Sequence, residues 1–211
     1  MRTGTWLPGS ILPAGMAAAL CLAGCRSETG PPTPPEAPVD QARVEAEGDE
    51  AMTIEISSTA FAEGEPIPKK YTGEGEDVSP PLAWDKLPEG TRQLALICDD
   101  PDAPTPEPWV HWVIYKIPAD AGGLAEGVAQ DAEPADPAGA CQGKNSWTDG
   151  QTIGYRGPMP PPGHGTHRYF FKLYALDEPL AIGPGVDKQT LLEKMSGHVI
   201  GRGQLMGTYE R

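Results

Sequence analysis

Aspartates, histidines and a tyrosine gather in two short segments of this 211-residue chain. The side chains concerned lie within residues 99–111 and 164–169: Asp99, Asp100, Asp102, His111, His164, His167 and Tyr169. Imidazole rings and a phenol hydroxyl donate hydrogen bonds to anions, and a carboxylate beside an imidazole fixes its tautomer and favours the protonated ring. The same residue types also serve metal-assisted or acid/base hydrolysis. The residues alone therefore leave an anion site and a hydrolytic site open.

Each polar segment lies where a loop meets an expected strand. Residues 93–98 are a short apolar run typical of an interior strand, and residues 168–176 alternate as a strand does. Residues 109–117 also alternate, which predicts a strand with Trp109, His111, Val113 and Tyr115 on one face. The loop before the strand at 168–176 is rich in proline and glycine, so its backbone is expected to be stiff and to hold a defined conformation. Such a loop lowers the ordering cost of binding.

The remaining pattern indicates a fold rich in strands and loops, as do 26 glycines and 25 prolines. A strand is expected at 52–57 and another at 207–211, and residues 120–146 are expected to cover the surface. Leu82 and Trp84 follow two prolines and are expected to pack inward. Residues 187–195 are the one convincing helix, with Gly197 as its stop.

The first residues of the chain have the pattern of an export signal. Arg2 is followed by an apolar run at 11–22, and Leu22-Ala23-Gly24-Cys25 resembles the lipobox of bacterial lipoproteins. The resemblance implies removal of residues 1–24 and acylation of Cys25 by chains such as palmitate, which anchor firmly when several are present. A generic secretory signal or membrane anchor is the alternative, although the run is short for a span. Arg26 in place of aspartate favours the outer membrane if the source is Gram-negative.

Residues 25–51 are predicted to be a disordered tether that begins at the lipidated cysteine. They are rich in proline, then in acidic residues and alanine, and show no hydrophobic periodicity. The folded domain is therefore expected at 52–211. It holds 23 acidic and 13 basic residues, so nucleic acid is excluded as a partner by overall repulsion. Cys98 and Cys141 remain in the exported domain, either as buried thiols or as a disulfide.

Seven motifs, each weak alone, occur together in a specific order. They are Ser79-Pro80-Pro81-Leu82-Ala83-Trp84, Asp100-Pro101-Asp102-Ala103-Pro104, Trp109-Val110-His111-Trp112, Gly154-Tyr155-Arg156-Gly157-Pro158, His167-Arg168-Tyr169, Gly197-His198-Val199 and Gly207-Thr208-Tyr209. By these motifs the chain resembles the phosphatidylethanolamine-binding protein family, in its bacterial Raf-kinase-inhibitor-like branch. The resemblance implies a mainly β domain in which a large antiparallel sheet faces a smaller sheet.

The resemblance also implies a surface pocket for phosphate-like anions, with no metal and no cofactor. Matching positions give the ligand-binding residues Asp100, Asp102, Trp109, His111, Gly157, His167 and Tyr169. We expect Asp100 to orient a histidine, His111 and His167 to contact the ligand, and Gly157 to expose backbone N–H groups. His164 and His198 are expected to lie outside the pocket. Met159 and the long loop with His164 depart from the usual bacterial pattern.

The function expected is that of a lipid-anchored binding domain of the cell envelope, without catalysis. Its ligand would be a phosphorylated small molecule, a phospholipid headgroup, or a protein partner such as a peptidase or kinase, of which the peptidase better fits an exported protein. The alternative is a hydrolase, but no Gly-x-Ser-x-Gly elbow is present and His164-x-x-His167 lacks helical spacing. A purely structural envelope protein is the third hypothesis.

Overall fold

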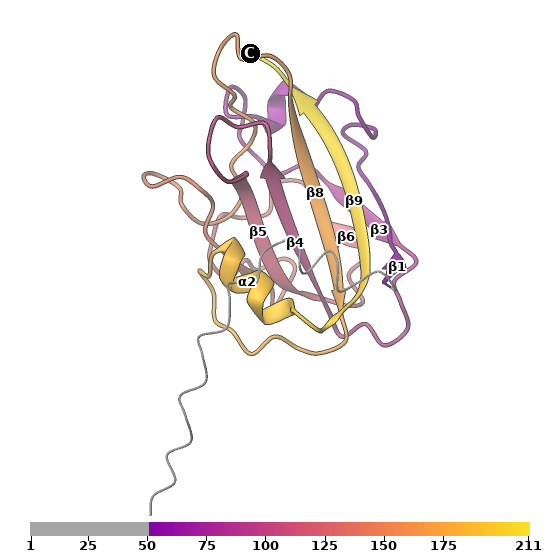
Figure 1. Cartoon of the computed structure of the whole chain (residues 1–211). Helices are drawn as coiled ribbons and strands as arrows, with labels where there is room; N and C mark the ends of the chain where they lie inside the picture. Colours follow the sequence, from indigo (N-terminus) through magenta and orange to yellow (C-terminus); the bar gives the residue numbers. More distant parts are fainter. Residues whose placement is uncertain (1–50) are drawn as a thin grey trace, which may run out of the picture. The chain divides into compact units, whose positions relative to one another are not determined.

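The computed structural model describes residues 51–211, and within them two β-sheets and an α-helix make up the domain (Figure 1). In this part the larger sheet contains, in spatial order, β1 (Met52–Thr53), β9 (Val199–Tyr209), β8 (His167–Leu176), β4 (Gln93–Asp100), β5 (Trp109–Pro118) and β7 (Cys141–Gln142). The smaller sheet contains β2 (Glu55–Ser57), β3 (Leu82–Asp85) and β6 (Gly123–Leu124). The mainly β prediction, with a large sheet facing a smaller one, is confirmed.

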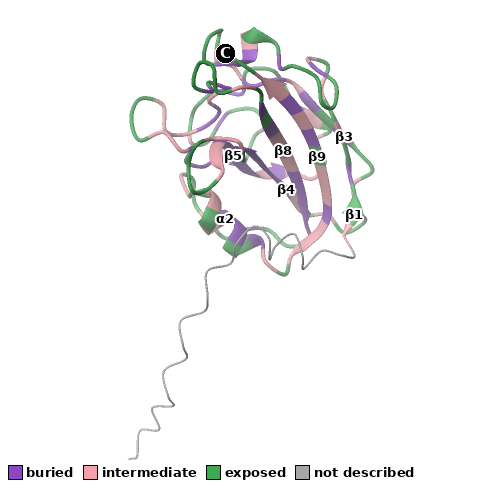
Figure 2. Ribbon diagram, turned by 45° about the horizontal axis from the view of Figure 1, so that its top comes forward, coloured by how far each residue is buried: buried purple, intermediate pink, exposed green. Residues whose placement is uncertain are grey.

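Strand β4 is the centre of the larger sheet. It runs antiparallel to β5 on one side and to β8 on the other, and every residue after Gln93 is buried. Figure 2 shows buried residues along the strands of the large sheet, and these residues form one packed cluster on each face. Leu94 and Leu96 pack toward the smaller sheet with Leu82 and Trp84, as expected for the last two, whereas Ile97 packs on the opposite face. Burial on both faces explains why this strand is an uninterrupted apolar run.

Helix α2 (Lys188–Met195) covers the face of the large sheet opposite the smaller sheet. Its N-cap is Asp187, whose carboxylate accepts a hydrogen bond from the Thr190 N–H at 2.8 Å. The apolar side of the helix, Leu191, Leu192 and Met195, is buried against the sheet. The predicted helix is confirmed, with Asp187 as its cap. A short 3-10 helix, η1 (Lys69–Tyr71), lies before β3.

Residues 52–57 form two strands in different sheets, so the prediction of a single strand there was wrong. β1 pairs in parallel with β9, whereas β2 pairs with β3. Between them Ile54 is buried and donates its N–H to the Arg202 carbonyl at 2.6 Å. One alternating run thus passes from one sheet to the other, a change of direction that the alternation of residues does not encode.

The C-terminal strand is longer than the predicted 207–211, and residues 120–146 contribute short strands to both sheets. Strand β9 begins at Val199, and glycines interrupt its alternation. A Cβ at Gly203 would lie 2.5 Å from the Ile54 carbonyl oxygen, and one at Gly207 would lie 2.5 Å from Ile67. These positions need glycine because other chain segments pack directly on the strand. Residues 120–146 contain β6 and β7, in addition to surface loops.

The expected faces of β5 are confirmed for residues 112–115 but were wrong for the first residues of the strand, because it contains a β-bulge there. Trp112 pairs with Cys98 and Val110 pairs with Asp99, so His111 is the extra residue between two paired positions. Val113 and Tyr115 pack beneath α2. His111 instead makes an edge contact with Tyr169, whose ring belongs to the core between the sheets. The bulge therefore separates His111 from the residues with which simple alternation grouped it.

The two cysteines of the domain are free thiols in the structure. Cys98 is buried between the sheets, whereas Cys141 is buried on the α2 side of the large sheet. Their positions in different layers decide between the two alternatives left open by the sequence, in favour of buried thiols.

The predictions for the N-terminal part fall largely outside the described residues. The signal peptide (1–24), the acylated Cys25 and all of the tether except its last residue belong to the part that the structure does not describe. Within residues 51–211, no helix combines the length and the apolar character required to cross a bilayer.

Candidate functional site

Antiparallel pairing brings the polar segments to one edge of the large sheet. Because β4 runs opposite to both β5 and β8, its last residues meet the first residues of both neighbours. Asp100 pairs with Trp109 of β5, and Asp99 pairs with Phe170 of β8. Residues far apart in the sequence are thereby placed beside one another, and the loops that follow β4 and precede β8 surround them.

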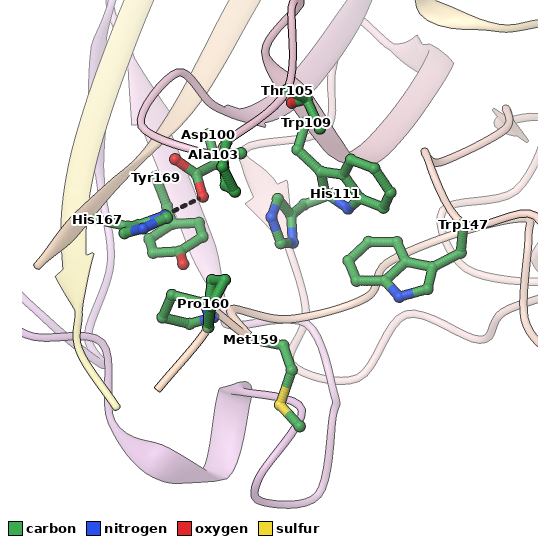
Figure 3. A pocket seen from close by; sticks show the side chains of 12 residues that line it. Asp100, Ala103, Thr105, Trp109, His111, Trp147, Met159, Pro160, His167 and Tyr169 are labelled. Atoms are coloured by element: carbon green, nitrogen blue, oxygen red, sulfur yellow. Dashed lines mark hydrogen bonds and ion pairs between the residues drawn. The ribbon is translucent and has the colours of Figure 1, made fainter. Parts of the chain in front are cut away.

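A cavity of about 220 Å³ opens at this edge (Figure 3). Five of the seven predicted ligand-binding residues line it, namely Asp100, Trp109, His111, His167 and Tyr169. The other lining residues are Ala103, Pro104, Thr105, Trp147, Met159, Pro160 and Pro161. Figure 3 shows His111 between the two tryptophans on one side and Tyr169 on the other. The cavity therefore has a polar base, aromatic walls and a rim of prolines.

A buried hydrogen bond between a carboxylate and an imidazole joins β4 to β8 at the base of the cavity. His167 Nδ1 lies 2.7 Å from Asp100 Oδ2, and the two side chains are only 2% and 5% exposed. The other carboxylate oxygen, Oδ1, accepts the Asp102 N–H at 2.8 Å. An ionised carboxylate only accepts, so His167 carries a proton on Nδ1. Asp100 thus orients His167, the more distant of the two candidate histidines in the sequence.

His111 is held by a different kind of partner. Its Nδ1 lies 2.6 Å from the Arg156 carbonyl oxygen and therefore donates to it. The side chain is buried, and this burial lowers the pKa of His111 although nearby carboxylates oppose the shift. The expected preference for a protonated ring does not hold for His111, whose partner is a carbonyl rather than a carboxylate. Its second nitrogen, Nε2, is left as a neutral acceptor that becomes a donor on protonation.

Tyr169 contributes a hydroxyl that stays neutral. Burial, followed by the negative charge of Asp100, raises the pKa of Tyr169 far above the physiological range. Its ring makes an edge contact with His111 at 5.1 Å between centroids. The hydroxyl therefore keeps its proton at physiological pH and can donate it to an anion.

Trp147 forms an aromatic wall that the sequence prediction missed. Its ring meets Trp109 edge-on at 5.3 Å and His111 at 5.1 Å between centroids. The Arg156 guanidinium lies 4.4 Å from the ring centroid of Trp147, a cation–π contact. The available signal was a tryptophan within a polar loop, which is a weak indication by itself. Arg156 thus fixes both His111, through its carbonyl, and Trp147, through its side chain.

Asp102 and Gly157 lie near the cavity without lining it. Arg168 holds both carboxylate oxygens of Asp102 through Nε and Nη2, at 2.9 and 2.8 Å, and this interaction lowers the pKa of Asp102. The Gly157 N–H, expected to face the ligand, donates to Asp77 at 2.6 Å. A Cβ at Gly157 would lie 2.1 Å from the Tyr71 carbonyl oxygen, so glycine is needed there for close packing.

The two histidines expected outside the pocket occupy very different places. His198 follows α2, where its N–H donates to the Met195 carbonyl and its ring lies 3.1 Å from Asp177. His164 does not line the cavity, but its Nδ1 lies 2.7 Å from His167 Nε2. The loop that carries His164 has no regular spacing, so the contact between these two rings could not be predicted from their positions in the chain.

The alternative of a metal-assisted hydrolase finds no supporting arrangement. Among residues 51–211, no three histidine, cysteine or acidic side chains converge in a way that could hold a metal ion. Asp100, His167 and His164 form a linear chain of hydrogen bonds rather than a set of ligands directed at one point.

Comparisons with known proteins agree with this architecture. The phosphatidylethanolamine-binding protein family matches residues 57–210. A protein of Methanothermobacter thermautotrophicus named UPF0098 protein is 49% identical over 158 residues, which are 75% of this chain and 99% of that protein. A crystal structure from Chlamydia trachomatis, described as a phosphatidylethanolamine-binding protein homologue, is 40% identical with a TM-score of 0.66 and covers 76% of this chain and 99% of its own. The chain therefore belongs to the phosphatidylethanolamine-binding protein family.

One relative extends the likeness beyond the domain. The Mycobacterium tuberculosis protein named "Putative lipoprotein LppC" is 37% identical over 202 residues, which are 93% of this chain and 94% of that protein. An alignment of this length reaches past the family domain into the N-terminal residues.

The lowered pKa of His111 predicts acid sensitivity. The folded pKa lies below the ordinary value of 6.5, so near pH 6 the unfolded chain binds more protons than the folded chain. The stability contributed by His111 is therefore complete above about pH 6.5 and decreases as the pH falls toward the folded pKa. We expect wild type to lose more free energy of unfolding than His111→Asn between about pH 7.5 and 5.5, measured by urea denaturation.

The variant keeps a side-chain amide that can donate to the Arg156 carbonyl but has no group that titrates in this range. An equal loss of stability in the two proteins would contradict the assignment of the acid sensitivity to His111.

Proposed function

We propose that the chain is a lipid-anchored binding protein of the cell envelope, and that its cavity binds a small organic phosphate without catalysis. The observation that carries this proposal is the buried Asp100–His167 pair beside the neutral hydroxyl of Tyr169. These groups and His111 surround one cavity. The Tyr169 hydroxyl and, once protonated, the Nε2 atoms of His111 and His167 are three donors from two strands that can converge on phosphate oxygens.

The charge of the cavity determines how an anion would bind. No lysine or arginine is among its lining residues, and Asp100 is negative. An incoming phosphate therefore needs a positive counterpart, which the histidines supply when they take up a proton. We infer that binding is linked to proton uptake and is tighter at mildly acidic pH, with His111 as the ring whose protonation is disfavoured by burial.

The walls favour an organic phosphate over inorganic phosphate. Trp109 and Trp147, which lie beside His111, and Met159 give the cavity an apolar wall. A volume of about 220 Å³ suits a small molecule or a headgroup rather than a whole lipid. A phosphate or carboxylate carried by a protein partner, such as a peptidase or a kinase, presents the same chemistry and is an outcome that the binding experiment distinguishes.

The phosphate proposal predicts saturable NMR shift changes in the mature chain, residues 25–211 with Cys25→Ser, on titration with O-phosphoethanolamine. The shifts should centre on His111, His167 and Tyr169, and ethanolamine alone should leave them unchanged. His111→Asn should weaken binding about 10- to 100-fold, because hydrogen bonds to charged groups contribute about 1.5–3 kcal/mol. His198→Ala, an exposed histidine outside the cavity, is the matched control.

Unchanged spectra at millimolar phosphate ester in wild type would sink the small-molecule proposal and turn attention to a protein partner. Hydrolysis of the ester during the titration, abolished in His111→Asn, would instead establish the enzyme alternative.

The anchoring proposal rests on Leu22-Ala23-Gly24-Cys25 and on the long alignment with the mycobacterial relative. We expect metabolic labelling with an alkyne analogue of palmitate to mark the wild-type protein. Cys25→Ser should abolish the label and leave a chain longer by the unremoved residues 1–24, visible by mass spectrometry. Cys21→Ser, in the same signal, should be labelled as wild type. Labelling that persists in Cys25→Ser would refute acylation at this residue.

A further inference from the structure

His164 lies on an exposed loop but contacts a buried residue of the site. It is flanked by Gly163 and Gly165, whose φ angles of +74° and +92° lie in the left-handed region. Its imidazole Nδ1 is 2.7 Å from His167 Nε2, and the ring centroids are 5.0 Å apart. The Pro160 and Pro161 rim of the cavity belongs to the same loop. The loop thus connects the rim directly to the base.

His164 occupies the second ring nitrogen of His167. The Asp100 carboxylate accepts from His167 Nδ1, so in the neutral ring Nε2 is an acceptor. His164 Nδ1 supplies the proton for the second bond. Both nitrogens of His167 are therefore engaged in the free protein. The nitrogen that the proposed function requires for a ligand is occupied by a side chain that does not line the cavity.

The exposed tip of the loop, residues 161–164, is held through contacts with the residues that follow β9. The Gly163 N–H donates to the Arg211 carbonyl at 3.0 Å, and Arg211 Nη1 donates to the Pro160 carbonyl at 3.2 Å. The Thr166 hydroxyl donates to Glu210 at 2.6 Å in an exposed position. Flanking glycines allow His164 to rotate away at small conformational cost. None of these contacts involves a strand of the sheet interior.

We propose that His164 is an internal competitor for the ligand, which must leave His167 Nε2 before a phosphate oxygen can bind there. This inference rests on the proposed function and names the residue that regulates its site. One proton is taken up from solvent by the pair of rings. It remains on His167 Nε2, which donates it to the phosphate, and His164 departs as a neutral ring. The exposed segment of residues 161–164 moves with it.

The test is the affinity of His164→Ala for O-phosphoethanolamine, compared with wild type and with His198→Ala, all in the mature chain with Cys25→Ser. Removal of a neutral hydrogen bond that competes with the ligand should tighten binding about 2- to 10-fold. His198→Ala should bind as wild type does. In parallel, long-range ¹H–¹⁵N spectra of the histidine rings report on His167 Nε2. In wild type, His167 Nε2 should be an unprotonated acceptor without the phosphate ester and a protonated donor when the protein is saturated with it.

The outcomes separate this inference from the proposed function. Equal or weaker binding by His164→Ala, when wild type binds, overturns the competitor role and leaves the proposed function intact. Absence of binding in wild type and His164→Ala alike overturns both. Binding detected only in His164→Ala supports the competitor role in its strongest form, and an unchanged His167 Nε2 signal on saturation of wild type contradicts it.

Discussion

The hydrogen-bonded pair of Asp100 and His167 is the interaction on which the site depends. It joins the end of β4 to the start of β8 and is almost fully buried. Removing His167 would leave the buried Asp100 carboxylate without this hydrogen bond, which typically costs about 1–3 kcal/mol or more for a charged group. The pair fixes the tautomer of His167, and the charge of Asp100 contributes to keeping Tyr169 neutral. Fold stability and ligand chemistry therefore share the same two residues.

Asp99 and Asp102 lie close to Asp100 in the chain, but each pairs with its own cations in a different direction. Asp99 points to the α2 side, where Lys188 Nζ and Lys172 Nζ lie 2.5 and 3.1 Å from its carboxylate. Asp102 lies in the loop and binds Arg168. Alternation along β4 thus places adjacent carboxylates on opposite faces of the sheet. One acidic segment thereby supports the helix, the cavity base and the loop after β4.

Much of the frame of this site could be predicted from the sequence. The apolar run of β4, the alternation in β8 and the Asp187 cap of α2 are local signals, and local interactions produce the elements they indicate. Antiparallel pairing then brought five predicted residues to one cavity. The family motifs indicated which of the many polar residues are expected to bind the ligand. Periodicity alone could not have distinguished them.

Other features depend on contacts between distant segments, so local patterns could not reveal them. The bulge at His111 appears only in the pairing of β5 with β4. The glycines of β9 would ordinarily indicate a break in a strand, but they are needed because Ile54 and Ile67 pack directly on their backbone. Trp147 and His164 lie in loops without periodicity, and their roles follow from Arg156 and His167. In each case a long-range partner determines the function of the residue.

The central claim is that a phosphate displaces His164 and binds to donors set by Asp100, and a crystal structure of the protein with O-phosphoethanolamine tests it most directly. The account predicts phosphorus within the cavity, with phosphate oxygens in hydrogen-bond distance of His111 Nε2, His167 Nε2 and the Tyr169 hydroxyl. His164 should be withdrawn from His167, while the bond between Asp100 and His167 persists. A phosphate bound elsewhere on the surface, or one bound in the cavity with His164 still on His167, would contradict the account.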